Sequence, residues 1–191
     1  MLNHLIFIRH SLPILDPKVP AFQWHLSDEG KMRCRALATY LKTYSPKMVF
    51  TSRESKAIET GQIIATYLKL SQKIIDGLHE HERPQTGNLD HEQFIASIAN
   101  FFKQPDQLIF GSETADAAYE RFSKAVDKVV KEALGNNNDC VAIVTHETVI
   151  SLFMWHVCHQ EPFSFWQQLG MPSYLILDYP AYKIKRIVYK V

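Results

Sequence analysis

A short apolar segment that runs directly into an Arg-His pair constrains this chain more than any other feature. Leu5-Ile6-Phe7-Ile8 is followed at once by Arg9, His10 and Ser11. A continuous apolar run of this length predicts a strand buried on both faces, as in the middle of a parallel sheet. The residues that follow lie where the strand leaves the sheet, which is where open α/β sheets bind ligands. Arginine grips phosphate oxygens and histidine is a nucleophile near neutral pH, so the pair is a candidate anion site. Two solvated polar residues at a strand end would give the same pattern.

Composition limits the classes of protein and partner. The chain has 191 residues, 46% of them hydrophobic, with a formal net charge of +1. This predicts one folded domain over residues 1–191 and offers no basic footprint for nucleic acid. Cys34, Cys140 and Cys158 form no C-x-x-C pair, which is typical of reduced residues in a cytoplasmic protein. The first apolar run is too short for a signal peptide or a membrane span, so we expect no membrane partner.

The remaining pattern alternates strands with helices. Short apolar runs predict further strands at 48–50, 73–75, 141–144, 174–177 and 184–189. Helical spacing predicts helices at 28–44, 53–70, 112–134 and 148–157, and one after a capping-box pattern at Asp90 and Gln93. This order predicts an α/β fold: a three-layer sandwich with a mostly parallel central sheet and helices on both faces. Residues 76–89 read as a loop rich in His and Glu, and we expect residues of about 79–111 to form a loop and helix cap over the site.

Three predicted strands end in groups that suit a phosphate. Besides Arg9 and His10, Thr51-Ser52 precedes a helix start that carries Arg53 and Lys56, and the strand at 141–144 runs into Thr145-His146. Parallel strands end at the same edge of a sheet, and two of these ends open helices, whose N-termini favour anions. Two histidines and two or three cations are therefore expected to converge on one point.

Motifs in the same order along nearly the whole chain resemble those of the histidine phosphatase superfamily, which has a phosphoglycerate-mutase-like fold. Arg9-His10-Ser11 is similar to the family's Arg-His-Gly, and Val144-Thr145-His146 to its Val-Ser-His. Four further segments that resemble family motifs are Leu26 to Gly30, Thr51 to Gly61, Leu78-His79-Glu80, and Gly111 to Thr114 with Arg121.

The resemblance implies a mechanism and assigns roles. In that family the first histidine forms a phosphohistidine, which water then hydrolyses, with no metal or cofactor; here the nucleophile would be His10. Arg9 and His146 would bind the phosphoryl oxygens, and Glu80 would protonate the leaving alcohol. His10 must then be neutral, with one ring nitrogen held by a hydrogen bond. Glu80 needs a partly desolvated pocket to remain protonated, and Glu82 on the same loop is an alternative acid.

The chain departs from the family pattern at four positions near the expected site. Ser11 replaces a glycine, Asp16 lies where many members carry an asparagine, and Lys56 occupies the usual arginine position, with Arg53 able to compensate. Glu147 stands where glycine is usual. If Asp16 or Glu147 faces the anion, it repels phosphate, unless the substrate brings a cation or a metal.

These observations leave several functions open. The first is a phosphomonoesterase acting on a phosphorylated small molecule or a phosphoprotein, with inorganic phosphate as product. A phosphoglycerate mutase is a close alternative, although it needs a second anion site for which we see no clear basic cluster. The third is a weak or inactive member of the family that binds a phosphorylated ligand or acts as a scaffold.

A metallohydrolase is a further alternative, because the chain has nine histidines. They include His79, His81, His156 and His159, but no H-E-x-x-H spacing occurs. His156 and His159 follow an apolar helix and are more simply explained by packing.

Overall fold

The computed structural model describes residues 1–83 and 90–191. Its strands form one sheet in the order β3-β2-β4-β1-β5-β6. They are β1 (His4–Arg9), β2 (Met48–Thr51), β3 (Ser71–Ile74), β4 (Cys140–Thr145), β5 (Ser173–Asp178) and β6 (Lys183–Val188). Strands β1 to β4 are parallel, whereas β5 is antiparallel to both β1 and β6. The predicted mostly parallel sheet is confirmed.

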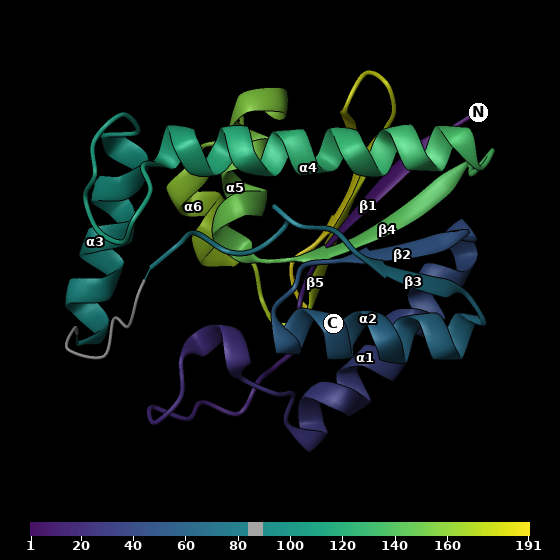
Figure 1. The fold of residues 1–191 in the computed structure, drawn as a ribbon, viewed down its shortest axis with the longest axis horizontal. Coiled ribbons are helices and arrows are strands. Elements are labelled where there is room, and N and C mark those ends of the chain that lie inside the picture. Colours follow the sequence, from purple (N-terminus) through teal and green to yellow (C-terminus); the bar gives the residue numbers. More distant parts are fainter. Residues whose placement is uncertain (84–89) are drawn as a thin grey trace.

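Helices cover both faces of the sheet, as predicted (Figure 1). One face carries α1 (Asp28–Leu41) and α2 (Ser55–Leu68), and the other carries α4 (Ala115–Gly135), α5 (Glu147–Cys158) and α6 (Pro162–Gln168). Helix α3 (His91–Lys103) stands at the end of the molecule beyond the carboxyl ends of the parallel strands. Short 3₁₀ turns lie at Ala21–Gln23 (η1) and Lys42–Tyr44 (η2).

The two faces of β1 and β4 explain why their sequences are continuously apolar. Phe7 and Ile143 belong to the core cluster under α4 and α5, whereas Ile8 and Val144 belong to the cluster under α1 and α2. Every residue of β4 is buried. Because side chains alternate between the faces of a strand, a strand packed on both sides needs an apolar residue at each position.

The helix starts follow local capping chemistry. The Ser27 hydroxyl accepts from the N–H of Gly30 at 3.0 Å, and Asp90 and Gln93 form the predicted capping box. Helix α4 begins at Ala115 after the N-cap Thr114, three residues after its predicted start, and α2 begins at Ser55, two residues after its predicted start. Helix α6 was not predicted, because its seven residues are too few to show a helical period.

None of the helices among the described residues combines the length and the apolarity that crossing a membrane requires. Cys34 and Cys140 are buried, Cys158 is half-buried, and all three are free thiols.

Gly30 gives a test of how α1 supports the loop after His10. A Cβ at Gly30 would lie 2.1 Å from the carbonyl oxygen of Leu12, so the backbone would have to move. We expect Gly30→Ala to lower the free energy of unfolding, measured in urea, by about 1–3 kcal/mol. Gly135→Ala, where a Cβ meets nothing within 4 Å, is the matched control and should change it by less than about 1 kcal/mol. Equal effects of the two substitutions would contradict this packing.

Candidate active site

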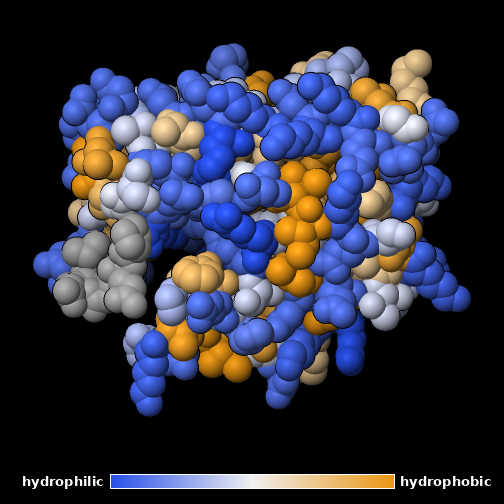
Figure 2. Space-filling model, viewed as in Figure 1, coloured by the Kyte–Doolittle hydropathy of each residue, from blue (hydrophilic) through white to orange (hydrophobic). Residues whose placement is uncertain are grey.

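The pairing of β1 with β4 places His10 beside His146. Arg9 is in register with Thr145, so the next residue of each strand is a histidine. The N–H of His10 donates to the carbonyl oxygen of Thr145 at 2.9 Å, and the two imidazole rings lie 5.1 Å apart between centroids. The predicted meeting of the two histidines at one sheet edge is therefore found. Figure 2 shows a hollow with hydrophilic walls on this side of the molecule, between α3 and the ends of the strands.

His10 is held in one tautomer. Its Nδ1 lies 2.8 Å from the carbonyl oxygen of Ser11, and because a carbonyl only accepts, Nδ1 carries the ring proton. Burial, followed by repulsion from a protonated His146 and by the charges of Lys56 and Arg9, holds the pKa of His10 well below its usual value. The ring is therefore neutral with its lone pair on Nε2, which is the state that a nucleophile requires.

His146 is fully buried and is also neutral. Burial and the nearby Lys56 charge hold its pKa well below the usual value. Its Nε2 lies 2.8 Å from the hydroxyl of Ser52, and that hydroxyl already accepts the N–H of Glu54 at 3.2 Å. The hydroxyl of Ser52 can donate to this Nε2, which also lies 3.5 Å from the carboxylate of Glu54. In that tautomer the ring proton is on Nδ1, which is buried and has no partner among the described residues, so it can donate to a ligand.

Lys56, at the start of α2, is a buried cation at the same edge of the sheet as the two histidines. Its ammonium bonds to Glu54 at 2.6 Å and to the carbonyl oxygen of Ala21 at 2.7 Å, and it lies 5.9 Å from the centre of the Trp24 ring. Burial tends to raise the pKa of Glu54, but the Lys56 charge and hydrogen bond outweigh burial and lower it. Lys56 and Glu54 thus form a buried ion pair.

Arg9 is paired with Glu147, the first residue of α5. Its Nη1 contacts both the carboxylate of Glu147 and the carbonyl oxygen of Leu169, and both side chains of the pair are largely buried. Its Nε is buried without a hydrogen-bond partner among the described residues. Burial raises the pKa of Glu147 to about 7, although the charge of Arg9 opposes that rise. Of the two acids that departed from the family pattern, Glu147 therefore faces the site.

Glu80 is held on a loop that α4 organises. Arg121 donates to the carbonyl oxygens of Gly77, His79 and Glu80 at 2.8–3.1 Å. The carboxylate of Glu80 accepts from the backbone of Thr148 at 3.3 Å and lies 3.5 Å from Arg83. The predicted loop acid is thus fixed against the N-terminus of α5, next to His146.

Burial alone does not keep Glu80 protonated in the free protein. Burial favours the neutral acid, but the charge of Arg83, together with the coupling to His146 and the N–H of His81, lowers the pKa of Glu80 below its usual value. Glu80 is therefore a carboxylate at neutral pH. The physical reason is Arg83, a cation on the same loop that the sequence analysis did not consider.

Glu82, the alternative acid to Glu80, and Arg53, the cation that could compensate for Lys56, both lie outside the group of side chains around His10 and His146. The side chain of Glu82 is 44% exposed, against 12% for Glu80, and it contacts His79 and Ser112. Arg53 is exposed and pairs with Asp76 at 3.2 Å, so the structure does not place it where it could compensate for Lys56. Arg53 lies two residues before the start of α2, and its side chain is 57% exposed to solvent.

The other two departures are accommodated locally. The hydroxyl of Ser11 donates to the carbonyl oxygen of Gly30 at 2.8 Å and therefore points towards α1. The carboxylate of Asp16 accepts the N–H of Lys18 at 2.9 Å within its own turn. Asp16 forms no ion pair with the cations of the site among the described residues.

Sequence reasoning missed Glu54 and Arg83. Glu54 joins Lys56, His146 and the backbone N–H of Glu80, which is 2.9 Å from its carboxylate. Arg83 lies over the Phe94 ring at 5.1 Å and has a buried Nη1 without a partner among the described residues. The only available signal was that each is a charged residue two or three positions from a predicted site residue.

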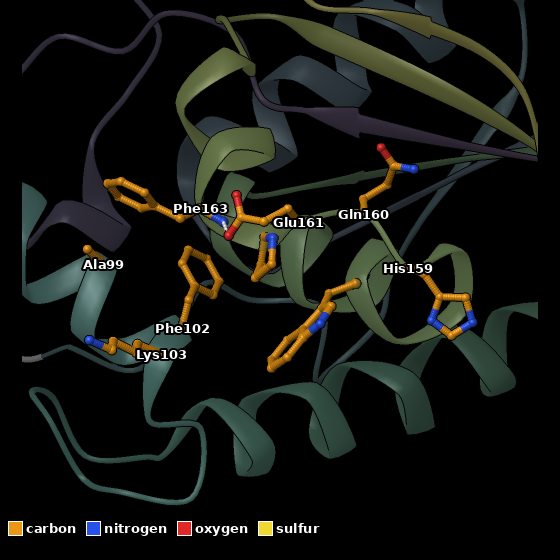
Figure 3. A pocket seen from close by; sticks show the side chains of 9 residues that line it. Ala99, Phe102, Lys103, His159, Gln160, Glu161 and Phe163 are labelled. Atoms are coloured by element: carbon orange, nitrogen blue, oxygen red, sulfur yellow. Dashed lines mark hydrogen bonds between the residues drawn. The ribbon is translucent and has the colours of Figure 1, made fainter.

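A groove lies elsewhere on the described part of the chain. It has a volume of about 600 Å³ between α3, α5 and α6, with Phe102 and Phe163 on its walls near Glu161 (Figure 3). It contains none of the residues around His10. The described residues also contain no group of three or more His, Cys, Asp or Glu side chains that could hold a metal ion.

Comparisons with known proteins agree with this fold. The family model described as "Histidine phosphatase superfamily (branch 1)" matches residues 5–187. A comparison with curated protein sequences found no match.

Solved structures resemble the chain over nearly its whole length. A mycobacterial glucosyl-3-phosphoglycerate phosphatase has a TM-score of 0.76 and 18% identity, with 99% of each chain covered. Bacillus stearothermophilus YhfR has a TM-score of 0.75 and 18% identity, covering 97% of this chain and 95% of its own. A mutant phosphoserine phosphatase from Entamoeba histolytica, in complex with phosphoserine, has a TM-score of 0.70 and 17% identity, covering 97% and 96%. At these identities the likeness concerns the fold.

The raised pKa of Glu147 predicts how stability depends on pH. Between its ordinary value and about 7, the folded protein keeps a proton that the unfolded chain has lost, so stability falls as pH rises through this window. Glu147→Gln removes this loss. The free energy of unfolding of the variant minus that of the wild type should therefore be about 1–3 kcal/mol larger at pH 8 than at pH 4.5. Urea unfolding at several pH values measures it. Glu120→Gln, at an exposed carboxylate paired with Lys124, is the control, and an identical pH dependence of wild type and Glu147→Gln would exclude a raised pKa.

Proposed function

The chain belongs to the histidine phosphatase superfamily, branch 1, and on this premise we propose that it is a phosphomonoesterase that works through a phosphohistidine intermediate. The observation that carries the proposal is the pair of neutral, buried imidazoles 5.1 Å apart, with the Nε2 of His10 free of its proton. The substrate class is a phosphorylated small molecule or phosphoprotein. The structural relatives named as phosphatases of glucosyl-3-phosphoglycerate and phosphoserine support the small-molecule choice.

His10 is the nucleophile. Its Nε2 attacks phosphorus, the bond from phosphorus to the ester oxygen breaks, and a phosphohistidine forms while the alcohol leaves. Water then attacks phosphorus and returns the electron pair to Nε2. The carbonyl oxygen of Ser11 holds the Nδ1 proton throughout, and it also stabilises the positive charge that the ring gains when it bonds to phosphorus.

The phosphoryl oxygens are bound by Arg9, Lys56 and His146. The Nε of Arg9 and the Nδ1 of His146 are both buried and have no partner among the described residues. A buried donor without an acceptor costs about 1–3 kcal/mol, and an oxyanion would remove that cost at both atoms. Lys56 contributes charge close to the two histidines.

Glu80 donates a proton to the leaving alcohol and later accepts one from the attacking water. In the free protein it is a carboxylate, because Arg83 and its hydrogen bonds lower its pKa. A phosphate dianion bound beside it opposes the effect of Arg83 and raises this pKa. When substrate binds, Glu80 therefore takes up a proton from solvent, and the first step passes that proton to the leaving alcohol. We also propose that residues of about 79–111 form a cap on this side of the site. Residues 84–89 of this range lie outside the described residues, and the described part includes Glu80 and α3.

A non-catalytic member that binds a phosphorylated ligand is the second candidate function. The pairing of Arg9 with Glu147 favours it, because a phosphate must compete with that carboxylate. The free thiols of Cys34, Cys140 and Cys158 fit a reducing compartment, so we propose a cytoplasmic location for either function.

Trapping the intermediate separates the two functions. Wild-type protein quenched in alkali during turnover of a radiolabelled aryl phosphate should carry acid-labile label, and His10→Ala should carry none and lose turnover. His159→Asn is the control, since His159 is exposed with a positive φ of 55° that asparagine tolerates. Turnover by His10→Ala would refute the nucleophile, and a wild type without label or turnover would indicate the binding protein.

The role of Glu80 is tested with two leaving groups. Glu80→Gln should reduce kcat for an alkyl phosphate by about 10²–10⁴-fold, because the alkoxide then leaves without a proton. With p-nitrophenyl phosphate the first step needs no acid, so the variant should release a burst of nitrophenol and then turn over slowly. Glu82→Gln is the matched control, and a larger loss in this control than in Glu80→Gln would assign the acid to Glu82.

A further inference from the structure

Three buried or half-buried cations of the site are each already paired with a carboxylate of the protein. The three pairs are Arg9 with Glu147, Lys56 with Glu54 and Arg83 with Glu80. With both histidines neutral, the cluster has no excess positive charge when all three carboxylates are ionised. A phosphate dianion that enters therefore adds two negative charges to a balanced group, and something else must compensate for them.

Of the three carboxylates, Glu147 has the fewest bonded partners among the described residues. Glu54 accepts the N–H of Glu80, and Glu80 accepts the N–H groups of His81 and Thr148. The carboxylate of Glu147 has Arg9 as its only bonded partner among the described residues. When a phosphoryl group binds the free Nε of Arg9, that guanidinium must serve two anions, so Glu147 becomes a buried carboxylate that shares its only bonded partner among the described residues, which is costly.

The position of Glu147 determines what can replace Arg9. Its carboxylate contacts Arg9 of β1, which binds the phosphoryl group, and its charge is coupled to Glu80 and Arg83 of the loop after β3. Glu80 is the acid that faces the leaving oxygen. The next residue, Thr148, donates its N–H to Glu80 at 3.3 Å, so Glu147, the first residue of α5, lies close to both Arg9 and Glu80.

We propose that Glu147 is a specificity-determining residue that selects phosphate monoesters whose leaving group carries an ammonium group close to the ester oxygen. The ammonium takes the place of Arg9 as the partner of Glu147, so the substrate supplies the positive charge that the site lacks. Phosphorylated amino alcohols are the simplest substrates of this class. The inference rests on the proposed function for its catalytic step, but the selection of the ligand does not require turnover.

The alternative is that Glu147 only positions Arg9. A positioning role would lower kcat/KM by the same factor for charged and uncharged substrates when Glu147 is changed. A specificity role changes the ratio between them. The burial that raises the pKa of Glu147 to about 7 adds a second signature, because the preference must grow as Glu147 ionises.

Phosphoethanolamine and propyl phosphate form the matched pair of substrates, since an ammonium in one replaces a methyl group of similar size in the other. At about pH 8 the wild type should have a kcat/KM for phosphoethanolamine about tenfold or more above that for propyl phosphate. At about pH 6 the ratio should shrink, because Glu147 holds a proton there while the ammonium keeps its charge. Glu147→Gln should bring the ratio near one at both pH values, and Glu120→Gln should leave it unchanged.

Binding to His10→Ala separates this inference from the proposed function. Calorimetry with the same two esters should show the tenfold preference in Kd, which Glu147→Gln in the same background abolishes. Equal Kd values for both esters, or a preference that survives in Glu147→Gln, would overturn the inference whether or not the enzyme turns over. A preference in Kd with no turnover by the wild type would leave the inference standing and overturn the phosphatase.

Discussion

The register between β1 and β4 is the constraint on which the site depends. Arg9 pairs with Thr145, and Thr51 of β2 pairs with Val144, so three strands end within one residue of each other. A slip of one residue would turn every side chain of a strand to the opposite face. Because β1 and β4 are apolar on both faces, their burial alone does not forbid such a slip. The backbone contact from His10 to Thr145 and the hydroxyl of Thr145, 2.6 Å from the carbonyl oxygen of Leu78, fix the ends instead.

The sequence predicts the layers of the fold well, because burial on both faces and helical spacing are local signals. The strands of the centre, β1, β2 and β4, were all predicted from short apolar runs. The edge strand β3 was misplaced by about two residues, since its exposed residues carry no apolar pattern. Helix α6 was missed because about two turns are too short to show a repeating pattern, and its position depends on packing against α5.

The site was predictable to the extent that it consists of strand ends. His10, His146, Arg9 and Lys56 meet at the edge where parallel strands finish, so a topological rule was sufficient to group them. Glu54 and Arg83 could not be found in that way. Glu54 is an N-cap residue that turns inward to Lys56, and Arg83 is a loop residue that folds back over Phe94. Both positions follow from tertiary contacts, which no spacing in the sequence encodes.

The pairing of cations with carboxylates follows from the burial that catalysis requires. A histidine nucleophile must remain neutral, and burial beside Lys56 and Arg9 keeps it so. The same burial makes an unpaired lysine or arginine costly, so each cation acquires an acid. A carboxylate that fully neutralises its cation leaves no net positive charge to attract phosphate. A carboxylate that also accepts several backbone N–H groups is costly for a ligand to displace. Glu147 differs because its burial disfavours its own charge and Arg9 is its bonded partner. Its pair with Arg9 is therefore the one of the three that a ligand can exchange at the lowest cost.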